Sequence, residues 1–77
     1  MNTFDRITID PKQMNGQPCI RGMRITVRRI LEAMATYEST SDICREFPEL
    51  EPMDVRQALE FAAANLADRT IEHATTT

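Results

Sequence analysis

The 77-residue sequence has too few cysteines and histidines for several common kinds of small domain. Its two cysteines, Cys19 and Cys44, form no C-x-x-C pair and lack the dense spacing of secreted mini-proteins, so we expect no disulfide framework. The single histidine, His73, cannot complete a zinc ligand set, and we expect no metal or other cofactor. Catalysis needs a nucleophile with a base, a poised carboxylate pair or a metal. We therefore expect a protein that is not an enzyme and has no catalytic residues.

Long apolar runs are also absent. No segment approaches the roughly 18 apolar residues of a membrane span, and the start MNTFDRITID does not resemble a signal peptide. These absences predict a cytoplasmic protein without membrane contacts. A single domain of this size buries only roughly 60% of the surface that its unfolded chain exposes, so we expect a homodimer. The predicted dimer surface is either the edge of the β segment or an alanine-rich face of the third helix around 62–66.

Charge is divided unevenly along the chain. Residues 1–29 hold six basic residues against two acidic ones, a net charge of +4, whereas residues 30–77 hold three basic residues against ten acidic ones, a net charge of −7. This division predicts one basic face that could meet phosphates or a carboxylate cluster. The alternative is that the acids are solvated on helix surfaces and the arginines pair with them.

Short β segments are expected at the N-terminus. Residues 6–9 alternate apolar and polar side chains before Asp10-Pro11, which predicts a short strand closed by a turn. Residues 12–17 contain Asn15-Gly16 and are expected to form a loop. Residues 18–26 form the second predicted β segment, in which Gly22 marks a turn, a bulge or a close backbone approach.

Three helices are expected after the β segments. Apolar residues at helical spacing and a cap at Thr26 predict a helix over 27–37. A second helix is capped by Ser39 and stopped by Pro48, and a third begins at Pro52 and runs to about Asp68. The fold class is therefore mainly α, in one domain over 1–73 with a disordered tail at 74–77. The predicted core consists of Ile30, Leu31, Met34, Ile43, Phe47, Leu50, Val55, Leu59 and Ala62.

The second and third helices have the dimensions of a helix-turn-helix unit. The outward face of the third helix is expected to carry Met53, Asp54, Arg56, Gln57 and Glu60. Arg56 and Gln57 are suited to guanine and adenine edges, and Arg28 and Arg29 to phosphates, so these four are the candidate DNA-binding residues. Asp54 and Glu60 oppose DNA binding because they would lie close to phosphates.

Four segments resemble the bacterial family catalogued as domain of unknown function 433. They are 7–11 (ITIDP), 16–27 (GQPCIRGMRITV), 47–50 (FPEL) and 54–59 (DVRQAL), and the resemblance covers roughly residues 5–67. It implies a homeodomain-like three-helix bundle preceded by short strands. Two positions depart from the family pattern, because Met23 replaces a common threonine and Glu51 stands where a serine or threonine would cap the third helix.

The resemblance also implies a function. Members of the family often lie beside genes for PIN-like nucleases and are regarded as antitoxins of the VapBC type. We therefore expect an antitoxin-like protein that neutralises a PIN-like nuclease and that could also regulate its own operon by binding DNA. Two alternatives are a DNA-binding regulator without a toxin and a plain interaction or dimerisation module.

Arg21 and Arg24 are the candidate partner-binding residues. The site of a PIN-like nuclease is a cluster of carboxylates around a metal ion, and an arginine fork suits such a cluster. The alternative is that these arginines form structural salt bridges with the protein's own Asp5, Asp10 or Glu32. Both interpretations could hold in different states.

Overall fold

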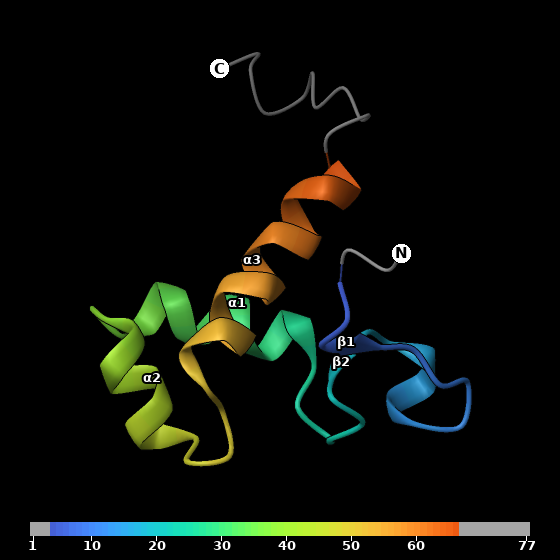
Figure 1. The fold of residues 1–77 in the computed structure, drawn as a ribbon, viewed down its shortest axis with the longest axis horizontal. Coiled ribbons are helices and arrows are strands. Elements are labelled where there is room, and N and C mark those ends of the chain that lie inside the picture. The colour runs from blue at the N-terminus through green and yellow to red at the C-terminus, as the bar shows by residue number, and fades with distance from the viewer. Residues whose placement is uncertain (1–3, 67–77) are drawn as a thin grey trace.

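A two-stranded β element and three α-helices follow one another along residues 4–66, the part of the chain that this computed structural model describes (Figure 1). The elements are β1 (Ile7–Thr8), the 3-10 turn η1 (Met14–Gly16), β2 (Cys19–Ile20), α1 (Val27–Thr36), α2 (Thr40–Glu46) and α3 (Pro52–Leu66). The prediction of a mainly α fold with a short N-terminal β element is confirmed. The predicted domain end at residue 73 and tail at 74–77 lie outside the described residues.

The β element is shorter than expected because its second segment folds back on itself. β1 and β2 pair antiparallel, with Ile7 opposite Ile20 and Thr8 opposite Cys19. After Ile20 the chain turns at Arg21-Gly22, and Thr26 returns to form a bridge with Cys19. The predicted strand over 18–26 is therefore a narrow hairpin, and Gly22 occupies its turn.

Side-chain caps define where the first two helices begin. The Thr26 hydroxyl accepts a hydrogen bond from the Arg29 amide at 3.0 Å, and the Ser39 hydroxyl accepts one from the Asp42 amide at 3.1 Å. Each cap satisfies an amide that has no partner within its helix. Both predicted caps are confirmed.

The core lies where α3 packs against α1 and α2, with β1 against α3. Its buried apolar residues are Ile7, Ile20, Val27, Ile30, Ala33, Ile43, Leu50, Val55 and Ala58. Leu31, Met34 and Phe47 pack against this cluster while partly exposed.

One predicted core residue is wrong. Leu59 is 47% exposed, because α3 directs Asp54, Val55, Gln57 and Ala58 inward instead. Hydrophobic periodicity could not reveal this orientation, since it counts polar residues such as Asp54 and Gln57 as outward-facing. Ala62, also predicted for the core, is only partly buried.

No helix in residues 4–66 is long and apolar enough to cross a membrane.

The assignment of the core can be tested by replacing isoleucine with alanine at one buried and one exposed position. Ile30 is fully buried and Ile9 is 61% exposed. Ile30→Ala should lower the free energy of unfolding by about 2–5 kcal/mol, because it removes buried methyl groups and leaves a cavity. Ile9→Ala should change it by less than about 0.5 kcal/mol. Urea denaturation followed by circular dichroism measures both values, and equal losses would contradict this assignment of the core.

Candidate functional site

A buried carboxylate joins the β element to the start of α3. The side chain of Asp54 is fully buried. Its Oδ1 accepts hydrogen bonds from Arg6 at 2.9 Å and from the Nε of Arg21 at 3.1 Å, while its Oδ2 accepts one from the Nη2 of Arg21 at 2.8 Å. The Glu51 amide also donates to Oδ2 at 2.8 Å. These donors compensate the buried negative charge of Asp54. We call Asp54, Arg6, Arg21 and Glu51 together the Asp54 cluster.

The Asp54 cluster also replaces the missing cap of α3. The side chain of Glu51 accepts a hydrogen bond from Arg6 at 2.7 Å, so the carboxylate that precedes the helix is engaged in an ion pair. Asp54, three residues later, instead reaches back to the Glu51 amide, which is half of a capping box. The departure of Glu51 from the family pattern therefore leaves the helix start well defined.

Arg21 adopts an unusual backbone conformation to reach Asp54. Its φ angle is 46° and that of Gly22 is 73°, and the Met23 amide donates to the Ile20 carbonyl at 2.7 Å across the turn. Positive φ at both central positions is typical of a tight hairpin turn, in which glycine is favoured at the second position. The Arg21 amide also donates to the Arg6 carbonyl at 2.8 Å, so backbone and side chain are both held.

Electrostatics within the Asp54 cluster favour the charged forms. Burial alone would raise the pKa of Asp54, but hydrogen bonds from Arg21, the Glu51 amide and Arg6 outweigh it and lower the pKa from 3.8 to about 2. The pKa of Arg6 is raised by its hydrogen bonds to Glu51 and Asp54, and that of Arg21 by its hydrogen bond to Asp54. Asp54, Arg6 and Arg21 therefore all carry charge near neutral pH.

The predicted outward position of Asp54 and Gln57 is wrong. Gln57 is only 7% exposed. Its Oε1 accepts a hydrogen bond from the Arg6 amide at 2.6 Å, and its Nε2 donates to Asp5 at 3.0 Å. Because both ends of the amide are engaged, Gln57 holds the N-terminal segment against α3 and is not placed to contact a base.

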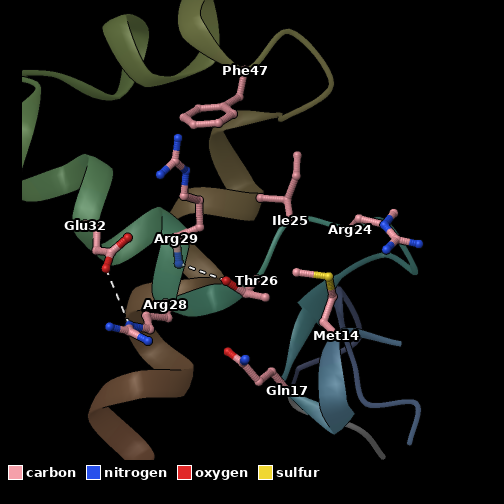
Figure 2. Close-up of a pocket in the computed structure, with 9 residues that line it drawn as sticks. All are labelled: Met14, Gln17, Arg24, Ile25, Thr26, Arg28, Arg29, Glu32 and Phe47. Atoms are coloured by element: carbon pink, nitrogen blue, oxygen red, sulfur yellow. Dashed lines mark hydrogen bonds and ion pairs between the residues drawn. The ribbon is translucent and has the colours of Figure 1, made fainter. Parts of the chain in front are cut away.

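Three of the remaining predicted arginines surround one open hollow, which we call the basic hollow (Figure 2). It has a volume of about 500 Å³ and is lined by Met14, Gln17, Arg24, Ile25, Thr26, Arg28, Arg29, Glu32 and Phe47. The Arg28 side chain is 79% exposed and lies 3.4 Å from Glu32, and the guanidinium of Arg29 lies 5.5 Å from the centre of the Phe47 ring. The side chain of Arg24 forms no hydrogen bond or ion pair with residues 4–66.

The arginines of the basic hollow stand around its rim. In Figure 2, Arg29 extends toward Phe47, Arg28 toward Glu32, and Arg24 lies on the opposite side, beyond Ile25. The first turn of α1 contains no acidic residue, so its positive end adds to the charge of these side chains. This arrangement does not favour stability, because cations are disfavoured at that end of a helix.

Arg56 lies apart from both groups. It is exposed on α3 and its Nε is 3.3 Å from Glu60, one helical turn away. The predicted site residues therefore separate into Arg21 and Gln57, which hold the fold, the three arginines of the basic hollow, and Arg56 on the outer face of α3.

The structural roles of Arg6 and Asp54 were missed in the sequence. Arg6 lies 48 residues before Asp54, and nothing in their spacing indicates contact. The position of Asp54, three residues after the helix cap, is a recognisable signal for an N-terminal hydrogen bond, but it does not reveal burial. Within residues 4–66, no group of three histidine, cysteine, aspartate or glutamate side chains is placed to hold a metal ion.

Comparison with known proteins identifies the family. Residues 7–62 match the family described as protein of unknown function DUF433. The chain belongs to this family. No curated protein and no solved structure matches the chain. The matched residues of this DUF433 protein include the whole hairpin, the basic hollow and most of α3, but the family description assigns them no activity.

Acid should weaken the DUF433 domain through Asp54. Its pKa is lower in the folded state than the ordinary value of 3.8, so the folded state binds fewer protons than the unfolded state between pH 3.8 and about 2. The resulting stabilisation, on the order of 2 kcal/mol, is complete above this range and is lost as the pH falls through it. We expect the stability difference between the parent and Asp54→Asn to shrink over the same range, as measured by thermal melting.

Asp42→Asn is the matched control for this experiment. It removes a carboxylate from an ion pair of 2.9 Å with Arg45 on the surface of α2. Surface pairs of this kind contribute little, so this variant should stay within about 0.5 kcal/mol of the parent at neutral pH. A parent protein that loses no stability between pH 3.8 and 2 would contradict the ionised state of the cluster.

Proposed function

We propose that this protein is an antitoxin-like partner of a PIN-like nuclease and that it contacts the nuclease through the basic hollow. The observation that carries the proposal is the grouping of Arg24, Arg28 and Arg29 around one open surface with few acidic neighbours. An interface of this kind suits a protein whose active site is a cluster of carboxylates, because arginine binds carboxylates with two parallel hydrogen bonds. The resemblance to the DUF433 family supports a nuclease as the acidic partner.

The proposed contact differs from an arginine fork made by Arg21 and Arg24. Arg21 directs its Nε and NH2 groups to Asp54 and also donates to the Glu49 carbonyl at 3.0 Å. A nuclease carboxylate would have to compete with a buried internal one for these donors. Arg24 has no internal competitor in residues 4–66, so we assign to Arg21 the role of holding the hairpin that presents Arg24.

Arg28 and Arg29 extend the contact beyond Arg24. Arg28 pairs with Glu32 only at the surface, where such a pair contributes little and can be exchanged for a stronger partner. Arg29 keeps its position through the Phe47 ring, which leaves its guanidinium edges able to donate. The three cations therefore form a surface that is charged and partly preorganised.

Binding to a nuclease can be tested with a double substitution. Arg24→Ala combined with Arg28→Ala should weaken binding to a PIN-like nuclease partner by a hundredfold or more, because truncating one partner of a buried charge pair costs about 2–5 kcal/mol. Titration calorimetry measures the affinity, and a nuclease assay measures inhibition. The variant should remain folded, since both side chains are exposed.

Arg45→Ala is the control for loss of a surface arginine. Arg45 is 75% exposed on α2 and, among residues 4–66, forms an ion pair with Asp42 alone. Its replacement should leave both binding and inhibition unchanged. A double variant that still inhibits as well as the parent would remove the basic hollow from the proposal, and absence of nuclease binding by the parent would remove the proposal itself.

A second candidate function is DNA binding through the helix-turn-helix of α2 and α3. The observation that favours it is Arg56, which is exposed on the helix that would enter the major groove. Arg28 and Arg29 would then contact phosphates, but Gln57 is withdrawn from the groove-facing side. DNA binding is opposed by three exposed acids near Arg56 or the start of α3, because they would face phosphates. They are Glu49, Glu51 and Glu60.

DNA binding predicts a different dependence on arginines. Arg56→Ala should weaken binding to the DNA upstream of the gene by about 1–3 kcal/mol and relax its base preference. Arg28→Ala should instead weaken binding to all sequences alike and reduce its salt dependence. Gel-shift titrations at several salt concentrations measure these effects, with Arg45→Ala as the control. Binding that is insensitive to Arg56→Ala would exclude base reading by α3.

A further inference from the structure

The outer face of α3 carries an apolar stripe that the domain itself leaves uncovered. Leu59 is 47% exposed and Leu66 is 52% exposed. The stripe consists of Pro52, Leu59, Ala63 and Leu66, with the charged Arg56 between the first two, and these positions alternate at intervals of four and three residues. That spacing places them along one side of a helix and is the spacing at which paired helices contact each other.

A second hollow lies beside the start of this stripe. It has a volume of about 410 Å³ and is lined by Met34, Thr40, Pro52, Met53, Val55, Arg56 and Leu59. Most of its lining is apolar, and Met53 is itself 51% exposed. The hollow therefore suits an apolar side chain supplied from outside the domain.

The stripe and the hollow are complementary under two-fold symmetry. Leu66 lies seven residues after Leu59, and Pro52 lies seven residues before it, which is about 10 Å along the helix in each direction. If two copies of α3 pair antiparallel with Leu59 at the centre, Leu66 of each copy lies opposite the hollow beside Pro52 of the other. A two-fold interface requires this kind of self-complementarity, because every contact occurs twice.

The charges on α3 fit the same pairing. Arg56 and Glu60 lie on opposite sides of Leu59 along the helix and have opposite charges. In an antiparallel pair centred on Leu59, Arg56 of one copy lies within one helical turn of Glu60 of the other. The mobile ends of both side chains can cover that distance. The two Glu60 side chains lie equally close in this pair, whereas a parallel pair would place Arg56 level with Arg56 as well as Glu60 level with Glu60.

We propose that α3 is the dimerisation helix of this protein and that its occupant is α3 of a second copy, packed antiparallel about Leu59. Leu66 of each copy fills the hollow between Met34 and Met53 of the other. Arg56 is covered in this dimer and is not free to enter a DNA groove. The basic hollow on α1 and the hairpin shares no residue with the stripe and stays open, so the inference does not depend on the proposed nuclease contact.

Sedimentation of the full chain at high micromolar concentration tests the pairing. The parent should be a dimer, and Leu59→Glu should raise the dissociation constant roughly tenfold or more, because the substitution places charge at the centre of the interface. Ile9→Glu is the matched control, since Ile9 is a 61% exposed apolar residue beside β1. It should not affect the dimer, whereas a dimer formed through the β edge would be weakened by it.

Variants with reversed charge at 56 or 60 test the pairing in a way that a folding defect cannot imitate, because dimerisation should return when the two variants are mixed. Arg56→Glu places acids at both 56 and 60, and Glu60→Arg places bases at both positions, so each variant alone should dimerise more weakly than the parent. An equimolar mixture should recover dimers, because each copy then meets opposite charges on its partner, although the pair within each helix stays broken. Circular dichroism confirms that both variants are helical.

Two results would overturn the proposal. One is a parent chain that remains monomeric at high micromolar concentration. The other is a dimer that tolerates Leu59→Glu, or whose two charge variants recover nothing on mixing.

Discussion

Burial of Asp54 is the constraint on which the rest of this structure depends. A carboxylate removed from water is tolerated only when donors surround it, and here the donors come from three places, Arg6 before β1, Arg21 in the hairpin turn and the Glu51 amide at the start of α3. The same segments also meet in the apolar core, where Ile7, Ile20 and Val55 pack together. Removing any one donor leaves the buried charge less fully compensated, so the positions of the donors are linked.

The orientation of α3 follows from this constraint. With Asp54 inward, Gln57 lies one turn further along the same side and meets the Arg6 amide and Asp5. Leu59 is then directed away from the core despite its apolar side chain. The orientation of α3 about its own axis therefore has two consequences. It forms the polar contacts that attach the β element to α3, and it leaves the apolar stripe exposed. The domain gains a fixed hairpin and leaves a surface that a second copy can cover.

Much of the fold could be predicted from local sequence, because its determinants are local. Thr26 and Ser39 cap their helices through side-chain hydrogen bonds to amides three residues away, and Gly22 marks a turn that needs positive φ. The inward face of α3 could not be predicted in this way. Its determinant is a contact between Arg6 and Asp54, which are separated by 48 residues, and hydrophobic periodicity treats both as surface residues. The same limit explains why Arg21 and Arg24, three residues apart in one motif, have different environments.

The uneven charge of the chain has a structural explanation in part. Of the six basic residues in 1–29, Arg6 and Arg21 are neutralised by acids from the other half of the chain, Asp54 and Glu51, and therefore do not contribute to a basic surface. Four basic residues remain, Lys12, Arg24, Arg28 and Arg29, and the three arginines among them line one hollow. Arg21 holds the hairpin turn, and Arg24 follows it three residues later in the same hairpin. The arginine that fixes the hairpin therefore also positions an arginine of the basic hollow. An external acidic partner would thus bind a surface whose geometry is set by the buried carboxylate of Asp54. The affinity of that partner would depend on Asp54 even though the two make no direct contact.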